Sequence, residues 1–198
     1  MSNFPNRLAF AGLLIAMSLS FASAADKPAM MTRGDWQAKP ALPRLIKHKP
    51  MAILIHHTAT KIKPNTLLAA KMKGLQRFSQ AKEKLADGRT KPAWPDVPYH
   101  FYIAADGKIA EGRDINAVGD TNTGYNPMGY IQVVLEGNFE TETPGAAQLS
   151  ALTSVLAWLK QNYNISTADI GSHDSVAQTA CPGKHLKALL PEIIAGLK

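Results

Sequence analysis

The sequence of 198 residues predicts a single α/β domain in which α-helices flank a mixed central β-sheet. Met51–Ile55 is an unbroken apolar run of the length and composition of a buried strand, and Tyr130–Leu135, which is interrupted only by Gln132, is expected to be another. Asp106-Gly107 separates two further strand-like segments, which is a strong β-hairpin signal. Leucines at helical spacing after Thr143 indicate a long helix. Because one strand pair is a hairpin, the sheet is expected to be mixed and not purely parallel.

The first 24 residues are expected to be a signal peptide and not part of the fold. Arg7 provides a short positive region, Leu8–Phe21 is mostly apolar, and Ala22-Ser23-Ala24 offers a small-x-small cleavage site. The apolar stretch is shorter than the ~20 residues that a spanning helix needs, so no stable membrane anchor is expected. We therefore expect an exported domain of residues 25–198, in the periplasm first and secreted as the alternative.

The first half of this domain begins with a Lys- and Pro-rich arm over residues 25–50. Within the arm, Thr32 could cap a short helix that contains Trp36. After the strand at Met51–Ile55, a helix is expected to open at residues 64–66 and to stop near Asp87-Gly88. Its apolar residues recur at helical spacing, at Leu68, Met72, Leu75 and Phe78.

The second half is expected to contain the hairpin, a loop, two strands and two helices. The hairpin strands are Tyr99–Ala104 and Lys108–Glu111, and Gly119–Gly129 is a Gly/Asn/Thr-rich loop of the kind that lines a site. Tyr130–Leu135 follows as a buried strand. Thr143-Pro144 is expected to start the long helix, with leucines at 149, 152, 156 and 159. Asp169–Ser172 is expected to be a short strand, and His185–Leu197 a closing helix.

Charge and cysteine content narrow the function classes. A formal net charge of +7 suits a polyanionic partner such as a cell wall, an anionic membrane or nucleic acid. The chain lacks a basic-aromatic patch, so we expect no nucleic-acid partner. The single cysteine, Cys181, has no disulfide partner in an exported chain. It is therefore either an inert core residue or a working ligand.

Histidines near this cysteine and at the end of the first strand indicate a metal site. His56-His57 closes the Met51–Ile55 run, and His173 precedes Cys181 by eight positions. One thiolate and two imidazoles are ligands that zinc prefers, and three protein ligands leave the fourth position open, as in catalytic sites. Neighbours on a strand face opposite sides, so only one of His56 and His57 can reach the metal, and their pattern leaves open which one.

The order of these motifs resembles the zinc-dependent N-acetylmuramoyl-L-alanine amidases of the phage T7 lysozyme and peptidoglycan-recognition-protein type. The similarity covers nearly the whole of residues 25–198, in order. The motifs that carry it are Arg33–Ala38, Ile55–Thr60 (Ile-His-His-Thr-Ala-Thr), Trp94–Phe101 (Trp-Pro-Asp-Val-Pro-Tyr-His-Phe), Asp106–Arg113, Gly124-Tyr125-Asn126, Glu136–Phe139 and His173–Pro182.

The resemblance implies a role for each matching residue. It implies that His56, His173 and Cys181 are the Zn²⁺ ligands, with His57 structural or adjacent to the ligands. It implies that Tyr99 is an active-site tyrosine. Thr179 stands where phage members carry a lysine and recognition-type amidases often have threonine, which implies a weaker, neutral donor to the developing oxyanion.

The chain departs from the family's usual pattern at three places near this site. Thr121 stands where phage-type members have a histidine before Gly-Tyr-Asn. Gln132 stands where the family's Ser-Ile-Gly strand has its glycine, and Val134 matches the catalytic glutamate of cytosolic relatives.

We therefore expect a zinc hydrolase that cleaves the amide bond between N-acetylmuramic acid and L-alanine in peptidoglycan or muropeptides, and that acts as a monomer. Two alternatives remain. One is a non-catalytic peptidoglycan-recognition module. The other is a secreted antibacterial amidase toxin with the same chemistry.

Overall fold

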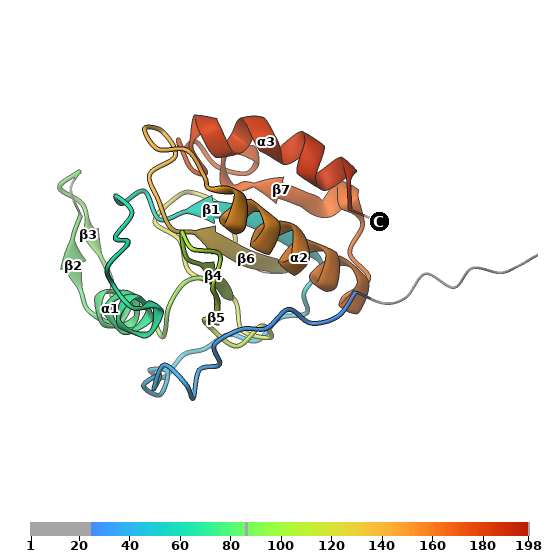
Figure 1. Ribbon diagram of the computed structural model, residues 1–198. Helices are drawn as coiled ribbons and strands as arrows, with labels where there is room; N and C mark the ends of the chain where they lie inside the picture. The colour runs from blue at the N-terminus through green and yellow to red at the C-terminus, as the bar shows by residue number, and fades with distance from the viewer. Residues whose placement is uncertain (1–24, 86, 198) are drawn as a thin grey trace, which may run out of the picture.

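The computed structural model describes residues 25–85 and 87–197 of the chain (Figure 1). The expected signal peptide lies outside these residues. Within the described part of the chain, no helix combines the length and the apolar character needed to cross a membrane.

A five-stranded mixed sheet forms the centre of the fold, as the sequence predicts. Its strand order is β5-β4-β6-β1-β7, and every pair is parallel except the β4–β5 hairpin. The strands are β1 (Ala52–His57), β4 (Phe101–Ile103), β5 (Ile109–Glu111), β6 (Tyr130–Leu135) and β7 (Ile170–Ser172). The two predicted buried strands become β1 and β6, two of the three interior strands of the sheet, because strands buried on both faces surround their mostly apolar side chains with other apolar groups.

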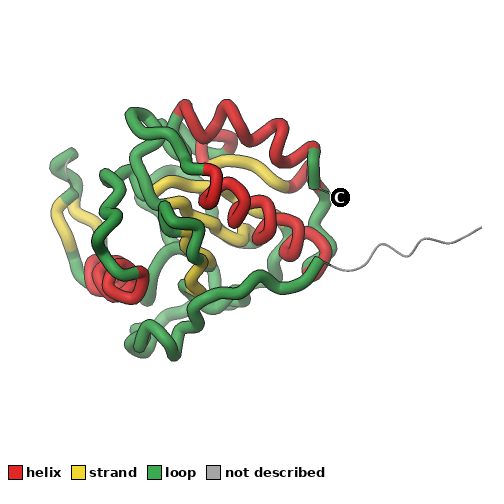
Figure 2. Tube along the Cα trace, in the orientation of Figure 1, coloured by secondary structure: helices red, strands yellow, loops and turns green. Residues whose placement is uncertain are grey.

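Helices cover both faces of this sheet (Figures 1 and 2). On one face α2 (Ala146–Asn162) and α3 (Lys184–Ala195) pack against buried side chains of β1 and β6. These are Ile53, Ile55, Ile131, Val133 and Leu135. On the other face α1 (Leu68–Gln80) packs against a smaller cluster around Trp36 and Met72. Side chains alternate along β1, so Ile55 and His57 face α2 and α3, whereas Leu54 and His56 face the α1 side.

The predicted extent of the first helix is wrong. In the structure, α1 begins at Leu68, after the predicted start at residues 64–66, and ends at Gln80, well before Asp87-Gly88. A small hairpin of β2 (Glu83–Lys84) and β3 (Thr90–Lys91) follows, and Gly88 adopts φ +85° at its turn. A left-handed residue of this kind favours glycine, so Asp87-Gly88 is a hairpin turn and not a helix stop.

A buried lysine binds carbonyl groups at the end of this helix. The Nζ atom of Lys91 donates to the carbonyl oxygens of Ser79 at 2.9 Å and Ala81 at 2.7 Å, and it lies 4.5 Å from the ring centroid of Trp94. Carbonyls at a helix C-terminus lack intrahelical donors, and a cation there also interacts favourably with the helix dipole.

Two other predictions about where helices begin are wrong. The long helix begins at Ala146, with Gly145 and not Thr143 at the N-cap position. Residues 33–37 form a turn and not a short helix, although Thr32 Oγ1 does accept a hydrogen bond from the Asp35 N–H at 3.2 Å. The arm lies against the domain, since Trp36 is fully buried and donates from Nε1 to the Glu111 carbonyl at 2.7 Å.

Candidate metal centre

Three strand and loop ends bring His56, His173 and Cys181 together. His56 lies near the end of β1, and β7 pairs with β1 in parallel with Ile55 opposite Ser172. This register places His173, the residue after β7, beside His56. Cys181 comes from the loop that precedes α3, which folds back toward the end of β1. One ligand atom from each residue lies within 4.8 Å of the others.

The spacing of these atoms suits a tetrahedral zinc ion. Sγ of Cys181 lies 3.7 Å from Nδ1 of His56, and the rings of His56 and His173 are 4.6 Å apart between centroids. Zinc–nitrogen and zinc–sulfur bonds of ~2.0–2.3 Å in tetrahedral geometry place two ligand atoms ~3.5 Å apart. In the described part of the chain, this is the one group of three or more His, Cys, Asp or Glu residues with ligand atoms this close.

The protonation of both histidines also fits a metal site. Burial, followed by the neighbouring His173 and His57, holds the pKa of His56 well below its ordinary value. Burial likewise lowers the pKa of His173, although Asp174 opposes this. Both imidazoles are therefore neutral near pH 7, which is the form that binds metals. His56 Nε2 is buried without a hydrogen-bond partner among the described residues.

The buried thiol of Cys181 needs a nearby positive charge if it is to ionise. Burial raises the pKa of its thiol to about 12, while the backbone N–H of His57 lowers it. A thiol with this pKa stays protonated at neutral pH unless a nearby cation stabilises the thiolate. Neutral imidazoles cannot supply that charge, whereas a coordinated metal ion deprotonates a thiol outright. The donor set therefore fits a zinc ion.

His57 does not join the cluster. Its ring faces the opposite side of β1, where it lies 6.1 Å from the Phe139 ring, and its Nδ1 accepts the Phe139 N–H at 3.1 Å. Val134, which is opposite His56 in the β1–β6 register, is buried and apolar. No carboxylate therefore reaches the cluster from that position of β6.

Tyr99 and Thr179 lie close to the cluster in space or in sequence. The Tyr99 ring is 5.3 Å from the His56 ring, between centroids. Burial, followed by Cys181 and Tyr125, raises the pKa of Tyr99 well above its ordinary value, so its hydroxyl keeps its proton. Thr179 Oγ1 accepts the Cys181 N–H at 3.2 Å, which orders the turn that carries the cysteine. Their catalytic roles stay predictions.

The sequence interpretation missed Thr123 of the Gly119–Gly129 loop and named Tyr125 only as part of the Gly124-Tyr125-Asn126 motif, without a role. Thr123 Oγ1 lies 2.7 Å from Nε2 of His173, and Tyr125 packs with its ring centroid 5.2 Å from that of His173. The loop itself was expected to line a site, but a loop has no periodicity from which the facing side chain could be chosen. The resemblance did not select Thr123 either, because at this end of the loop it drew attention to Thr121, whose Oγ1 lies 2.8 Å from Thr123 Oγ1.

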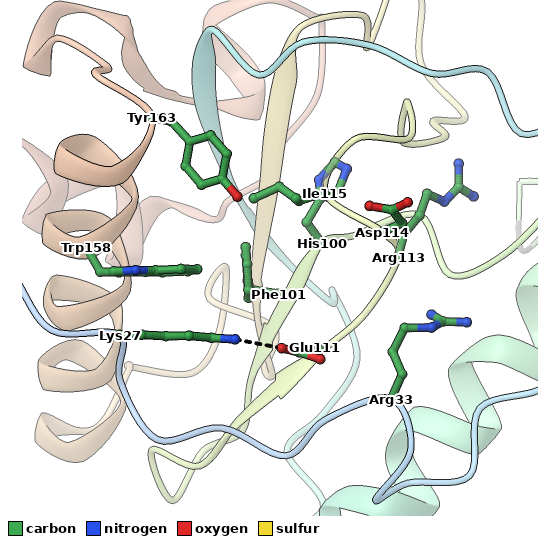
Figure 3. A pocket seen from close by; sticks show the side chains of 10 residues that line it. All are labelled: Lys27, Arg33, His100, Phe101, Glu111, Arg113, Asp114, Ile115, Trp158 and Tyr163. Atoms are coloured by element: carbon green, nitrogen blue, oxygen red, sulfur yellow. Dashed lines mark hydrogen bonds and ion pairs between the residues drawn. The ribbon is translucent and has the colours of Figure 1, made fainter.

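A separate pocket of about 350 Å³ lies between the N-terminal arm, the end of β5 and α2 (Figure 3). Trp158 and Tyr163 of the α2 region form one wall. Two of its charged side chains are paired with each other, since Lys27 Nζ lies 2.9 Å from Glu111 Oε1. None of the three cluster residues lines this pocket, so it is distinct from the candidate metal centre.

The chain that holds this cluster is similar in sequence to known proteins. A family model described as N-acetylmuramoyl-L-alanine amidase matches residues 47–184. Peptidoglycan-recognition protein SD of Drosophila melanogaster is 29% identical over 185 residues, which cover 91% of this chain and 94% of that protein. An N-acetylmuramoyl-L-alanine amidase of Sus scrofa is 31% identical over 170 residues, which cover 82% of this chain but only 27% of that longer protein.

Solved structures of the same kinds of protein superpose on this chain. The crystal structure of Drosophila peptidoglycan recognition protein SD superposes with a TM-score of 0.72 at 27% identity, over 84% of this chain and 95% of that one. The N-acetylmuramoyl-L-alanine amidase LysC from Clostridium intestinale superposes with a TM-score of 0.66 at 28% identity, over 86% and 98% of the two chains. The similarity therefore spans the fold as well as the motifs.

Proposed function

The chain belongs to the N-acetylmuramoyl-L-alanine amidase family, and from that premise we propose that it is a zinc-dependent amidase that cleaves the bond between N-acetylmuramic acid and L-alanine in peptidoglycan. The observation that carries the proposal is the convergence of His56, His173 and Cys181 within 4.8 Å. A recognition module has no need of a buried thiol beside two neutral imidazoles, whereas a hydrolytic metal site does.

The three cluster residues would hold the metal. When bound, a zinc ion held by one thiolate and two neutral imidazoles keeps a net positive charge and supplies a Lewis acid that also lowers the pKa of a water toward ~7. His56 and His173 contribute by staying neutral at the operating pH, and the His57 N–H contributes by donating to the Cys181 sulfur at 3.4 Å. Each of these features favours the ligand form of the side chain.

Tyr99 is proposed as the hydrogen-bond donor to the scissile carbonyl oxygen. Its raised pKa keeps the hydroxyl protonated across the physiological range, so it can donate to negative charge that develops on that oxygen. Thr179 is proposed as a second and weaker donor. Its oxygen already accepts the Cys181 N–H, which leaves the hydroxyl hydrogen for the substrate.

Peptidoglycan or a soluble muropeptide is the proposed substrate, since the relatives are named as peptidoglycan-recognition proteins and amidases. The formal net charge of +6 that remains after loss of Arg7 with residues 1–24 would attract an anionic wall polymer. We further propose that the protein is exported after cleavage behind Ala24, that it acts in the periplasm as a monomer, and that nucleic acid is not a partner.

Mass spectrometry of digested peptidoglycan tests the activity and its metal together. Residues 25–198 would be incubated with purified sacculi before chelation, after chelation and after return of zinc. Free stem peptides that begin with L-alanine, lost on chelation and restored by zinc, are the expected products. A folded, zinc-loaded protein that releases no such peptide from sacculi or soluble muropeptides would contradict the amidase and favour a recognition module.

A further inference from the structure

One ring nitrogen of His173 is already engaged by a side chain outside the cluster. Nε2 of His173 lies 2.7 Å from Oγ1 of Thr123, which is a short hydrogen bond. His173 comes from the end of β7, whereas Thr123 belongs to the loop before β6, so the contact joins two separate parts of the chain. Nδ1 is then the nitrogen of His173 that remains for the cluster.

This contact decides which tautomer of His173 can serve as a ligand. A neutral imidazole carries one N–H, and the nitrogen that binds a metal must be the one without it. With Nδ1 toward the cluster, the hydrogen must reside on Nε2, where Thr123 Oγ1 accepts it. Ligand histidines in metal sites generally donate their second nitrogen to an acceptor in this manner, and that bond fixes the orientation of the ring.

We propose that Thr123 is a positioning residue for His173, whose Nε2–H it accepts so that Nδ1 is presented to the zinc site. The inference rests on the proposed zinc-dependent function. It adds a residue that is not one of the three proposed ligands and that acts through the ring of His173.

Hydrogen bonds around Thr123 allow its hydroxyl oxygen to act as the acceptor. Thr121 Oγ1 lies 2.8 Å from Thr123 Oγ1 and also accepts the Thr123 N–H at 3.1 Å. Thr123 can therefore pass its own hydroxyl hydrogen to Thr121 while its oxygen receives the hydrogen from His173. The sequence of donors runs from the histidine outward, which is the direction that leaves Nδ1 free of hydrogen.

The loop is also held on both sides of Thr123. Arg89, next to the β2–β3 hairpin turn, donates from a guanidinium nitrogen to the Asn122 carbonyl at 2.8 Å. On the other side, the Tyr125 hydroxyl donates to Oε1 of Gln132, a fully buried residue of β6, at 3.1 Å. A hydroxyl anchored in this way can orient a ligand, because its own position is set by neighbours on both sides.

Three variants separate positioning from packing. Thr123→Val keeps the shape of the side chain but removes the acceptor, and we expect zinc affinity to fall by about 10- to 100-fold. Thr123→Ser restores the hydroxyl and should bind zinc within a few-fold of the parent chain. Thr153→Val is the matched control, since that threonine is exposed on α2 and its hydroxyl bonds only to the Leu149 carbonyl in its own helix.

Zinc affinity would be measured by competition with a chromophoric chelator, beside the visible spectrum of the cobalt-loaded protein and the melting temperature of the metal-free protein. Weaker zinc binding and an altered cobalt spectrum in Thr123→Val alone, at an unchanged metal-free melting temperature, would support the proposal. Zinc binding by Thr123→Val equal to that of the parent chain would overturn it.

A second measurement needs no variant. Nitrogen-15 spectra of the zinc-loaded parent chain report which ring nitrogen of His173 carries hydrogen. Hydrogen on Nε2 is expected, and hydrogen on Nδ1 would overturn the proposal even if Thr123→Val failed to fold. Failure of the proposed function looks different: the parent chain itself would bind no zinc, or would bind zinc and release no stem peptide from peptidoglycan.

Discussion

The backbone N–H of His57 donates a hydrogen bond to Sγ of Cys181 across 3.4 Å. The residue beside the proposed ligand His56 thus also supports the proposed ligand Cys181, although 124 positions separate the two in the chain. A donor aimed at the sulfur favours the thiolate and partly offsets the burial that raises the pKa of the thiol to about 12. The end of β1 therefore serves both the histidine and the cysteine.

Replacing the cysteine should abolish metal binding but leave the fold in place. We expect Cys181→Ser to lose zinc by at least about 100-fold in affinity, because a serine hydroxyl does not ionise as a thiol does and is a poor zinc ligand. Amidase activity should fall below detection. Metal content by atomic spectroscopy and circular dichroism of the same sample provide the test.

Ala180→Ser is the matched control for this cysteine variant. It adds a hydroxyl to the exposed neighbouring residue and should retain zinc and activity. Stoichiometric zinc in Cys181→Ser would mean that the sulfur is not a ligand.

Removing the Tyr99 hydroxyl should slow the reaction without releasing the metal. We expect Tyr99→Phe to lower kcat by about 10²-fold, the effect of losing one donor to a developing oxyanion. Zinc content and melting temperature should remain those of the parent chain. Tyr102→Phe is the control, because that ring packs with Trp36 and Met72 in the α1-side cluster. Equal kcat values for the two variants would remove Tyr99 from the chemistry.

The parts of the fold that could be predicted are those that a short stretch of neighbouring residues specifies. The β1 and β6 strands appear as apolar runs, and the β4–β5 hairpin appears through Asp106-Gly107, since each is specified by neighbouring residues. The end of α1 could not be predicted in this manner. The carbonyls at that end bind Lys91, which lies outside the helix and resembles an ordinary charged loop residue until its burial is seen.

The candidate site likewise has features that could be predicted from the sequence and one that could not. The residues of the cluster could be predicted from their types, and family resemblance selected His56, the histidine of the His56-His57 pair that lies in the cluster. The Thr123 contact could not be predicted, because it requires knowing how the Gly119–Gly129 loop lies against the end of β7. Contacts between separate loops leave no pattern in either one.

Removing one partner of the buried ion pair between Lys71 and Glu136 should strongly destabilise the protein. Lys71 Nζ lies 2.7 Å from Glu136 Oε2, with side chains 10% and 4% exposed, and the same carboxylate accepts the Lys63 and Ala105 N–H groups. Lys71→Met leaves this carboxylate buried without its cation, so we expect a loss of about 3 kcal/mol in the free energy of unfolding. Urea titration measures this loss.

Lys73→Met, an exposed position on the same helix, should change the free energy of unfolding by less than about 0.5 kcal/mol. Adding Glu136→Gln to Lys71→Met should recover part of the loss, because the uncompensated charge is then removed. Equal effects of Lys71→Met and Lys73→Met would show that the pair contributes nothing beyond a surface contact.

Stability should fall at mildly acidic pH because of His100. Its Nε2 donates to the Ala117 carbonyl at 2.9 Å, and its Nδ1 accepts the Gln132 N–H at 2.8 Å, so both nitrogens are committed to the neutral ring. Burial is the main cause that lowers the pKa of His100 from 6.5 to about 4. Between these two pH values the unfolded chain binds the proton and the folded chain does not. The contribution of His100 is therefore complete above pH 6.5 and is lost progressively as the pH falls toward 4, by about 3 kcal/mol in all.

Other buried histidines shift in the same direction, so a variant is needed to isolate this one. His100→Gln keeps one donor and one acceptor in the side chain but cannot titrate in this range. Urea unfolding of the metal-free proteins would be compared from pH 4.5 to 7.5. The stability advantage of the parent chain over His100→Gln should be largest above pH 6.5 and shrink by about 2–3 kcal/mol at pH 4.5. An advantage that stays constant across this range would show that His100 titrates in the folded protein as it does in the unfolded chain, and that its two hydrogen bonds do not hold the ring neutral.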